Sequence, residues 1–151
     1  MIGLLQRVSE ARVDVGSSTL GRIAGGLAVL IGVERGDTGL EADRLLERLV
    51  TYRVFADEQG KMNLSLLDTG GSLLLVPQFT LAAQTRKGTR PGFSTAADPA
   101  EGRRLFDYLA EEARKRLAIV QTGEFGAHMR VSLTNDGPVT FWLRVAPGES
   151  D

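Results

Sequence analysis

The sequence predicts a single α+β domain in which antiparallel β-sheet predominates. The chain has 151 residues, a length that suits one domain with its own core. Short apolar segments between Gly-rich turns fill the first third, as in antiparallel meanders. Two segments of helical period follow, and each is succeeded by strand-like segments. No repeat or linker divides the chain, so we expect a domain over residues 1–146 and a frayed tail over residues 147–151.

The first third of the chain has the composition of β structure. Residues 3–15 (GLLQRVSEARVDV) are rich in Val and Leu, and residues 16–26 place a short strand between turn residues. Residues 27–34 (LAVLIGVE) form a continuous apolar run of strand length. Such a run is typical of a strand that is buried on both faces.

The first helix is predicted within residues 37–55, with Asp37 or Thr38 as its N-cap. The apolar residues that share one face of this helix are Leu40, Leu45, Leu46, Leu49 and Val50. Residues 56–63 (ADEQGKMN) then form a turn, and residues 70–81 (GGSLLLVPQFTL) give the most apolar strand.

The second helix begins at Asp98, which is followed by Pro99 at the first helical position and by Glu101 three residues after the cap. Its apolar positions at helical spacing are Leu105, Phe106, Leu109, Ala113 and Leu117. Between the last strand and this helix, residues 84–97 are a polar loop that contains Gly and Pro. Residues 119–145 return to strands.

Composition excludes several kinds of site. The chain has no cysteine and a single histidine, His128, so neither a disulfide framework nor a His-rich metal centre is expected. We interpret His128 as a partly exposed structural residue. The N-terminal apolar segment is too short for a secretory signal, and no run approaches the roughly 20 residues of a membrane helix. We therefore expect a cytoplasmic protein with no metal, no cofactor and no membrane contact.

The segment around Pro77 is a candidate site. Gln78 and Thr80 lie within a strongly apolar run, and a buried polar side chain without a partner costs about 1–3 kcal/mol. Pro77 interrupts the strand, and a bulge there would release backbone N–H groups toward a ligand. An edge strand whose polar groups are satisfied explains the same residues equally well.

Three basic residues, Arg86, Lys87 and Arg90, follow within a short distance. A solvated loop accounts for them, and a small phosphate-contacting patch beside the site is the alternative. Because the net charge of the chain is −1, any contact with RNA should be local.

Gly137 and Pro138 separate two strand-like runs in the segment TNDGPVTFWL. The Asp-Gly pair is typical of a hairpin turn, so the local sequence predicts a turn between two strands. A proline after the glycine would also hold the backbone carbonyls at the tip of that turn in place.

Together, PQFTL and NDGPVTFWL allow a family to be recognised. The sequence resembles the D-aminoacyl-tRNA deacylases, the chiral proofreading enzymes of translation. The resemblance extends over nearly the whole chain, through QRV, GGLAVLIGVE, YRVF, GKMNLS and RPGFS. It implies hydrolysis of the ester of D-aminoacyl-tRNA, and of glycyl-tRNA mischarged on tRNA(Ala).

The resemblance also implies a fold and a site. The fold is an antiparallel sheet curved into a barrel-like body with two main helices, in a homodimer whose active site lies at the subunit interface. A strand with the catalytic residues Gln78, Phe79 and Thr80 of one subunit faces the Gly137–Pro138 turn of the other, and the Gly137–Pro138 peptide bond is cis. The 3′-terminal adenosine of the tRNA packs at Phe125 and Met129, and Arg7 holds the Gly-Pro turn. We expect Asn135 and Pro77 beside the substrate.

One position departs from the family. Its first motif usually begins with serine, S-Q-F-T, where this chain has Pro77. A serine nucleophile would make this chain inactive, whereas backbone N–H groups of Phe79 and Thr80 could still stabilise an oxyanion. Two alternatives therefore stay open: another aminoacyl- or peptidyl-tRNA esterase that uses Thr80 or Ser132, and an inactive β-rich dimeric binding module.

Overall fold

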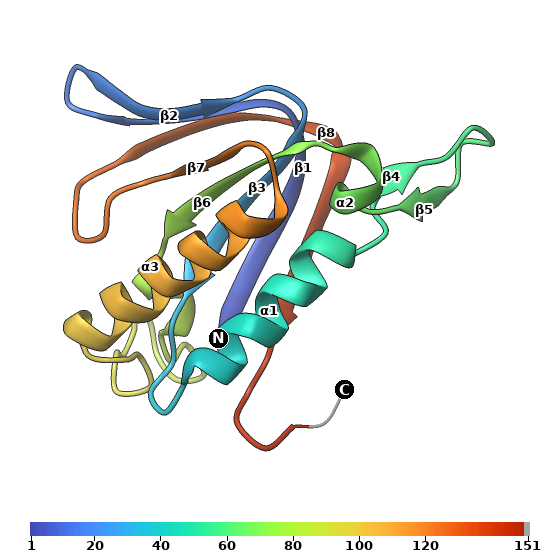
Figure 1. The fold of residues 1–151 in the computed structure, drawn as a ribbon. Coiled ribbons are helices and arrows are strands. Elements are labelled where there is room, and N and C mark those ends of the chain that lie inside the picture. The colour runs from blue at the N-terminus through green and yellow to red at the C-terminus, as the bar shows by residue number, and fades with distance from the viewer. Residues whose placement is uncertain (150–151) are drawn as a thin grey trace.

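The computed structural model describes residues 1–149, and its elements alternate between strands and helices (Figure 1). In chain order they are β1 (Ile2–Val15), β2 (Ser18–Ile23), β3 (Gly26–Gly32), α1 (Gly39–Thr51), β4 (Phe55–Ala56), β5 (Met62–Leu64), α2 (Leu66–Thr69), β6 (Ser72–Pro77), the 3-10 turn η1 (Phe79–Ala82), α3 (Pro99–Arg116), β7 (Val120–Thr122) and β8 (Arg130–Arg144). The predicted α+β class and the two main helices, α1 and α3, are confirmed.

The main sheet is mixed: antiparallel pairs predominate in it, as predicted, and two further pairs are parallel. Its strand order is β2-β1-β3-β6-β7, and β8 pairs with β1. Strand β1 runs antiparallel to β2, β3 and β8, whereas β6 runs parallel to both of its neighbours, β3 and β7. Along the chain, the connection from β3 to β6 contains α1, and the connection from β6 to β7 contains α3. A helix is the usual crossover between parallel strands.

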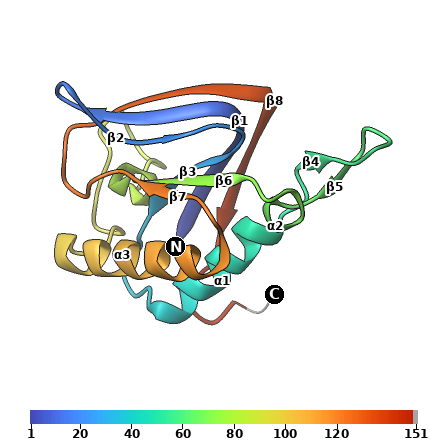
Figure 2. The same cartoon turned by 45° about the horizontal axis from the view of Figure 1, so that its top comes forward.

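Two long strands fold the sheet back over itself. The first part of β1 pairs with β3 and its last part pairs with β2, while β8 follows β1 along both parts. The β1–β8 register shifts between Gln6 and Val8 and again between Val8 and Glu10. Such bulges bend strands, and Figure 2 shows β1, β2 and β8 turning over the layer of β3, β6 and β7. The result is the barrel-like body that the resemblance implies.

Two apolar clusters fill the spaces that this folding creates. Helices α1 and α3 cover one face of the sheet (Figure 1). The larger cluster lies between these helices and the sheet and includes Leu5, Leu45, Leu73 and Leu109. A smaller cluster lies between the folded parts of the sheet and includes Val13, Ile23 and Val76. Because β3 and β6 contribute to both clusters, they are apolar on both faces, as their continuous apolar sequences predict.

Helix α1 has the better capped N-terminus of the two main helices. Thr38 and Glu41 form a capping box, in which the Leu40 N–H donates to Thr38 Oγ1 and the Thr38 N–H donates to Glu41 Oε2. The hydroxyl of Thr38 also donates to Glu41 (2.7 Å), which holds the pKa of that carboxyl below its usual range. The prediction is wrong at Leu40, which is 62% exposed.

Helix α3 begins after Asp98 as predicted, with Pro99 at its first position, although the Asp98 side chain makes no capping hydrogen bond. Its apolar positions Leu105, Leu109 and Ala113 are buried. No helix within residues 1–149 is long and apolar enough to cross a membrane.

The predicted frayed tail is described only in part. Residues 147–149 form a turn in which the Glu149 N–H donates to Ala146 O (3.2 Å). Residues 150–151 lie outside the described residues.

Candidate active site

Gly137 and Pro138 lie in a bulge of one continuous strand. In β8, Asn135 pairs with Val8 and Thr140 pairs with Gln6, so residues 136–139 stand opposite the single residue Arg7. The prediction of a hairpin turn between two strands is therefore wrong. Both sides of this segment pair with β1, so the chain bulges outward and continues in the same direction. Residues 136–139 are called the bulge below.

Side chains from both strands fix the bulge. Asn135 spans its base: Nδ2 donates to Val139 O (3.2 Å) and to Thr140 Oγ1 (3.0 Å), and Oδ1 accepts from the Val139 N–H (2.7 Å). Arg7 donates from Nε to Asp136 O (2.8 Å) and from Nη1 to Val54 O (2.6 Å). The backbone of the bulge is thus held at both ends.

The tip of the bulge is open to solvent. Gly137 and Pro138 are both exposed, and the peptide bond between them is cis. Gly137 has φ +152°, and a Cβ atom there would come within 2.7 Å of the Val139 nitrogen. Only glycine fits this conformation without displacing Val139.

Residues 78–82 form a turn and not a strand, so the strand prediction is wrong for Gln78, Phe79 and Thr80. Strand β6 ends at Pro77, the Gln78 N–H donates to Ile31 O (2.7 Å), and η1 follows. Gly32 makes room for this turn, because a Cβ atom there would lie 2.9 Å from Leu81 Cβ. The neighbouring strand β3 thus fixes where η1 begins.

The side chains of this turn face outward. Phe79 is 59% exposed and packs against Phe93, with ring centroids 5.2 Å apart. Thr80 is exposed and Gln78 half-buried, so the expectation of buried polar groups is wrong. Gln78 Nε2 donates to Thr80 Oγ1. Within residues 1–149, the backbone N–H groups of Phe79 and Thr80 have no acceptor, as expected at the start of a helical turn.

Met129 and Phe125 lie on the loop beside Pro77. Met129 and Pro77 both lie close to Gly123, where a Cβ atom would be 2.7 Å from Met129 Sδ and 3.3 Å from Pro77 Cδ. Phe125 packs on Gly102 of α3, and the guanidinium of Arg103 lies 5.4 Å from the ring centroid. The structure therefore brings Met129 close to the start of η1 and fixes Phe125 against α3.

The bulge and η1 lie far apart in one chain. The bulge lies opposite Arg7, which pairs with Leu27 of β3, whereas Pro77, just before η1, pairs with Ile31 of β3. The two segments are therefore four residues apart along β3. Across the sheet they are three strand spacings apart, from β8 over β1 and β3 to β6. Strand spacings of about 4.8 Å and rises of about 3.3 Å per residue make this separation on the order of 20 Å. Both views place η1 and the bend of β8 on opposite sides of the molecule (Figures 1 and 2).

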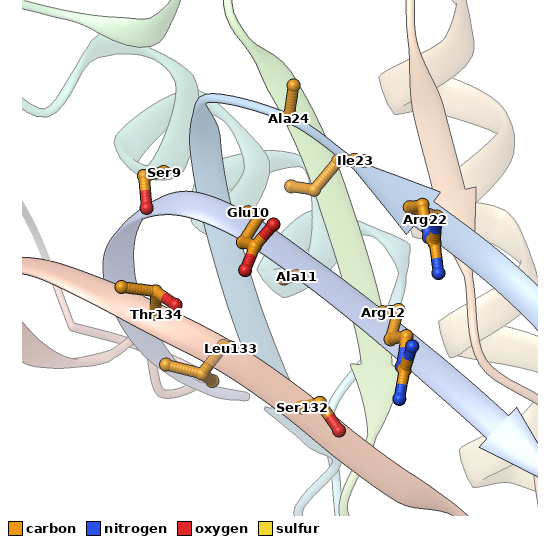
Figure 3. A pocket seen from close by; sticks show the side chains of 10 residues that line it. All are labelled: Ser9, Glu10, Ala11, Arg12, Arg22, Ile23, Ala24, Ser132, Leu133 and Thr134. Carbon is orange, nitrogen blue, oxygen red and sulfur yellow. The ribbon is translucent and has the colours of Figure 1, made fainter.

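One cavity is lined by none of the residues that the resemblance assigns to the site. It has a volume of about 670 Å³ and is lined by Ser9, Glu10, Ala11, Arg12, Arg22, Ile23, Ala24, Ser132, Leu133 and Thr134 (Figure 3). Ser132, the alternative nucleophile, is among them, and its position in β8 is opposite Arg12. His128, the only histidine of the chain, does not line this cavity, so no imidazole base is available to Ser132 there. The residues that the resemblance assigns to the site lie instead at η1, at the bulge and on the loop beside Pro77.

Metal-binding side chains do not gather in the described part of the chain. No group of three or more His, Asp or Glu side chains suited to a metal ion occurs within residues 1–149. His128 is exposed, on the loop before β8.

Sequence reasoning missed three features of the site. It assigned Asn135 to the substrate, which stays a prediction, and did not foresee that its amide spans the base of the bulge. It also overlooked Gly32 and Gly123, which make room for η1 and Met129. The two glycines stand at strand ends, where a turn explains them equally well, so only the packing reveals their role.

Comparison with known proteins gives consistent matches over the full chain. A family model described as D-Tyr-tRNA(Tyr) deacylase matches residues 4–144. A D-aminoacyl-tRNA deacylase of Janthinobacterium sp. (strain Marseille) is 63% identical over 97% of this chain and 99% of its own. The enzyme of the same name from Thioalkalivibrio sulfidiphilus (strain HL-EbGR7) is 64% identical with the same coverage.

Solved structures match the fold over nearly the whole chain. A c-Myc DNA unwinding element binding protein superposes with a TM-score of 0.92 and 36% identity, over 97% of this chain and 99% of that one. A probable eukaryotic D-amino acid tRNA deacylase, at 17% identity, has a TM-score of 0.82 over 94% and 97% of the two chains, which shows a shared fold.

Proposed function

Because the chain belongs to the D-Tyr-tRNA(Tyr) deacylase family, we propose that its main-chain groups, contributed by two subunits, hydrolyse D-aminoacyl-tRNA and reject the L-form. The chain is a D-aminoacyl-tRNA deacylase, a hydrolase, since relatives of that name are 63% and 64% identical to it over nearly its full length. Its substrate occurs in the cytoplasm, where we expect it to act. The mechanism, the dimer and the glycine substrate are the proposal.

The observation that carries the proposal is the separation of the bulge from η1. The two segments are on the order of 20 Å apart along the sheet of one chain. Each exposes backbone groups, and each depends on a glycine, Gly137 or Gly32, where a Cβ atom would meet neighbouring atoms at less than 3 Å. One ester cannot reach both segments of the same chain. A two-fold dimer in which the bulge of one subunit faces η1 of the other would bring them together.

The ester chemistry requires little from side chains. An aminoacyl ester is already activated, and preorganised N–H donors at a developing oxyanion contribute about 3–4 kcal/mol each. The unpaired N–H groups of Phe79 and Thr80 are assigned this role. Water, or the ribose 2′-hydroxyl beside the ester, is the attacking or assisting group. Thr80 Oγ1 already accepts a hydrogen bond from Gln78, so it is not assigned as the nucleophile.

Selection between D and L follows from steric exclusion at the bulge. The two forms exchange the positions of hydrogen and side chain at Cα. With the amino group and the carbonyl fixed, an L side chain would collide with the carbonyls of Gly137 and Pro138 of the partner subunit, whereas a hydrogen atom passes. Glycine has no side chain on either side, so glycyl-tRNA(Ala) is proposed as a second substrate.

The remaining predicted residues surround this site. Phe125 and Met129 are assigned to the 3′-terminal adenosine, because an aromatic face and a polarisable sulfur both suit a base. Their packing against Gly102 and Gly123 supports a preformed surface. Pro77 touches this surface through Gly123 and replaces the family's serine without changing Gln78, Phe79 or Thr80.

A single-turnover deacylation assay tests the proposal. With enzyme in excess, D-Tyr-tRNA(Tyr) and glycyl-tRNA(Ala) are expected to lose their amino acid, and L-Tyr-tRNA(Tyr) is expected to keep it. Equal rates on the D- and L-forms would refute the steric filter. A trapped acyl-enzyme on Thr80 or Ser132 would indicate a different esterase, and absence of hydrolysis would indicate a binding module.

Sedimentation tests the dimer separately. A homodimer at the concentrations of the assay is expected, and a strictly monomeric active enzyme would overturn the shared site.

A further inference from the structure

We propose that residues 84–92, called the basic loop below, bind phosphate groups of the tRNA acceptor stem next to the ester. This inference deepens the proposed function and rests on it. The basic loop carries Arg86, Lys87 and Arg90. The ligand class is the phosphodiester backbone of RNA, recognised by charge and not by base sequence.

Residues 69–97, which include the basic loop, contain positively charged side chains and no negatively charged ones. Between Asp68 and Asp98 the chain contains no acidic residue, and its basic residues there are those of the basic loop. In the described part of the chain, no carboxylate forms an ion pair with any of the three. All three side chains are exposed. A chain of net charge −1 therefore has a local cluster of unpaired positive charge.

The exposed basic residues of α3 provide the contrast. Arg104 pairs with Glu101 (2.9 Å), Arg114 with Glu111 (2.9 Å) and Lys115 with Glu112 (2.6 Å). These charges are neutralised by neighbours on the same helix. The basic loop has no such neighbours, so a phosphate would face less competition there.

The basic loop is anchored beside η1. Its base is closed by two backbone hydrogen bonds, from the Gln84 N–H to Gly92 O (2.7 Å) and from the Gly92 N–H to Gln84 O (3.1 Å). The chain just beyond the loop is tied to η1, because Thr95 Oγ1 donates to Ala82 O (2.6 Å) and the ring of Phe93 packs on Phe79. The base of the basic loop is therefore fixed next to η1, the segment with the proposed oxyanion donors, and the three charged side chains of the loop are exposed.

A groove extends from the basic loop along the protein. It has a volume of about 490 Å³, and its lining includes Thr85 and Arg86 of the loop together with Thr95. With the 3′ end of the tRNA bound at η1, the stem must leave across a neighbouring surface. The basic loop is the neighbour that suits a polyanion.

Neutralising the loop tests this inference. The variant carries Arg86→Gln, Lys87→Gln and Arg90→Gln, and the matched control carries Arg104→Gln, Arg114→Gln and Lys115→Gln. For D-Tyr-tRNA(Tyr), kcat/KM is measured across a series of KCl concentrations, and the same rates are measured on D-tyrosyl-adenosine, which has the ester but no stem. Melting temperatures check that both proteins are folded.

The loop variant is expected to lose about tenfold or more in kcat/KM on the tRNA substrate at low salt, and its slope against salt concentration is expected to fall by about 2 to 3. The rate of the loop variant on D-tyrosyl-adenosine should equal that of the unchanged enzyme. The control variant should keep both the kcat/KM on tRNA and the salt slope of the unchanged enzyme. A loop variant with unchanged kcat/KM and salt slope on tRNA overturns the inference and leaves the proposed function intact. An equal loss on both substrates also overturns it, since the loop would then support the site itself.

Binding of uncharged tRNA separates this inference from the proposed function. Its Kd does not depend on hydrolysis, so the comparison holds even for an enzyme that fails to deacylate. Weaker binding by the loop variant than by the control supports the phosphate contact, and equal binding overturns it.

Discussion

The bulge and η1 are both exposed, but they are held in different ways. Side chains fix the bulge: Asn135 spans its base and Arg7 binds the carbonyl of Asp136. Backbone packing fixes η1: the Gln78 N–H is bonded to β3, and Gly32 leaves room for Leu81. In the bulge, the Val139 N–H donates to Asn135 Oδ1, whereas the N–H groups of Phe79 and Thr80 in η1 have no acceptor among residues 1–149.

This difference fits two separate tasks. A surface that excludes the wrong enantiomer needs a fixed shape, and side-chain hydrogen bonds provide one. A surface that stabilises charge needs donors that no protein group already uses. Substitutions should therefore affect selectivity at the bulge and rate at η1, and the following predictions test that division.

The largest effect is expected for Gly32→Ala. The added Cβ atom would lie 2.9 Å from Leu81 Cβ and 3.4 Å from the Ala82 nitrogen, so η1 must shift. A displacement of the reacting groups by about 1 Å reduces rates by about 100-fold. The single-turnover rate on D-Tyr-tRNA(Tyr) measures the loss. Gly25→Ala is the matched control, because a Cβ atom there has nothing within 4 Å; equal rates for the two variants would contradict the prediction.

Arg7→Met is expected to reduce stability and selectivity together. The change removes hydrogen bonds to Val54 O (2.6 Å) and Asp136 O (2.8 Å), and losing charged hydrogen bonds at a partly buried site costs about 2 kcal/mol. Urea unfolding measures the stability, and the ratio of D to L rates measures the selectivity. Arg12→Met, at a more exposed position of the same strand, should change both by much less.

Asn135→Ala should affect discrimination more than rate. Without the amide, the Val139 N–H loses its partner, and the base of the bulge is free to open. We expect the ratio of D to L rates to fall by about tenfold, equivalent to about 1.4 kcal/mol, with the D rate nearly unchanged. Asn135→Asp keeps an acceptor for the Val139 N–H and should retain part of the discrimination. Loss of the D rate with discrimination intact would reverse the roles of the two segments.

The smallest effect is expected for Thr80→Ala. The hydroxyl accepts a hydrogen bond from Gln78 and is not the proposed nucleophile. The exposed position makes a change within about threefold the expected result, since surface substitutions usually shift free energies by about 0.5 kcal/mol. Complete loss of single-turnover rate in a folded Thr80→Ala protein would refute the backbone mechanism.

Local signals in the sequence predicted the helices well. The start of α1 agrees with Thr38, one of the two predicted N-caps, and the start of α3 agrees with Asp98 followed by Pro99, although Asp98 makes no capping hydrogen bond. The apolar runs of β3 and β6 likewise predicted buried strands. Both kinds of signal are complete within a short window of sequence.

Features that depend on distant partners could not be predicted in this way. The parallel pairing of β3 with β6 requires a crossover, and the bulge at Gly137 exists because β1 continues beside both ends of it. A Gly-Pro pair is compatible with a turn and with a bulge alike. The turn η1 after Pro77 likewise needs the space that Gly32 leaves in the adjacent strand.

Pro77 also occupies a position where the sheet does not require a donor. Successive residues of a strand direct their backbone groups to opposite sides. The Gln78 N–H bonds to Ile31 O in β3, while Leu75 O accepts from the Gly123 N–H on the β7 side. An N–H at position 77 would therefore point toward the β7 side, where β6–β7 pairing has already ended at Leu75 and Thr122. Proline at this position therefore leaves the strand ladder whole, and a residue with an N–H there would add no bond to it.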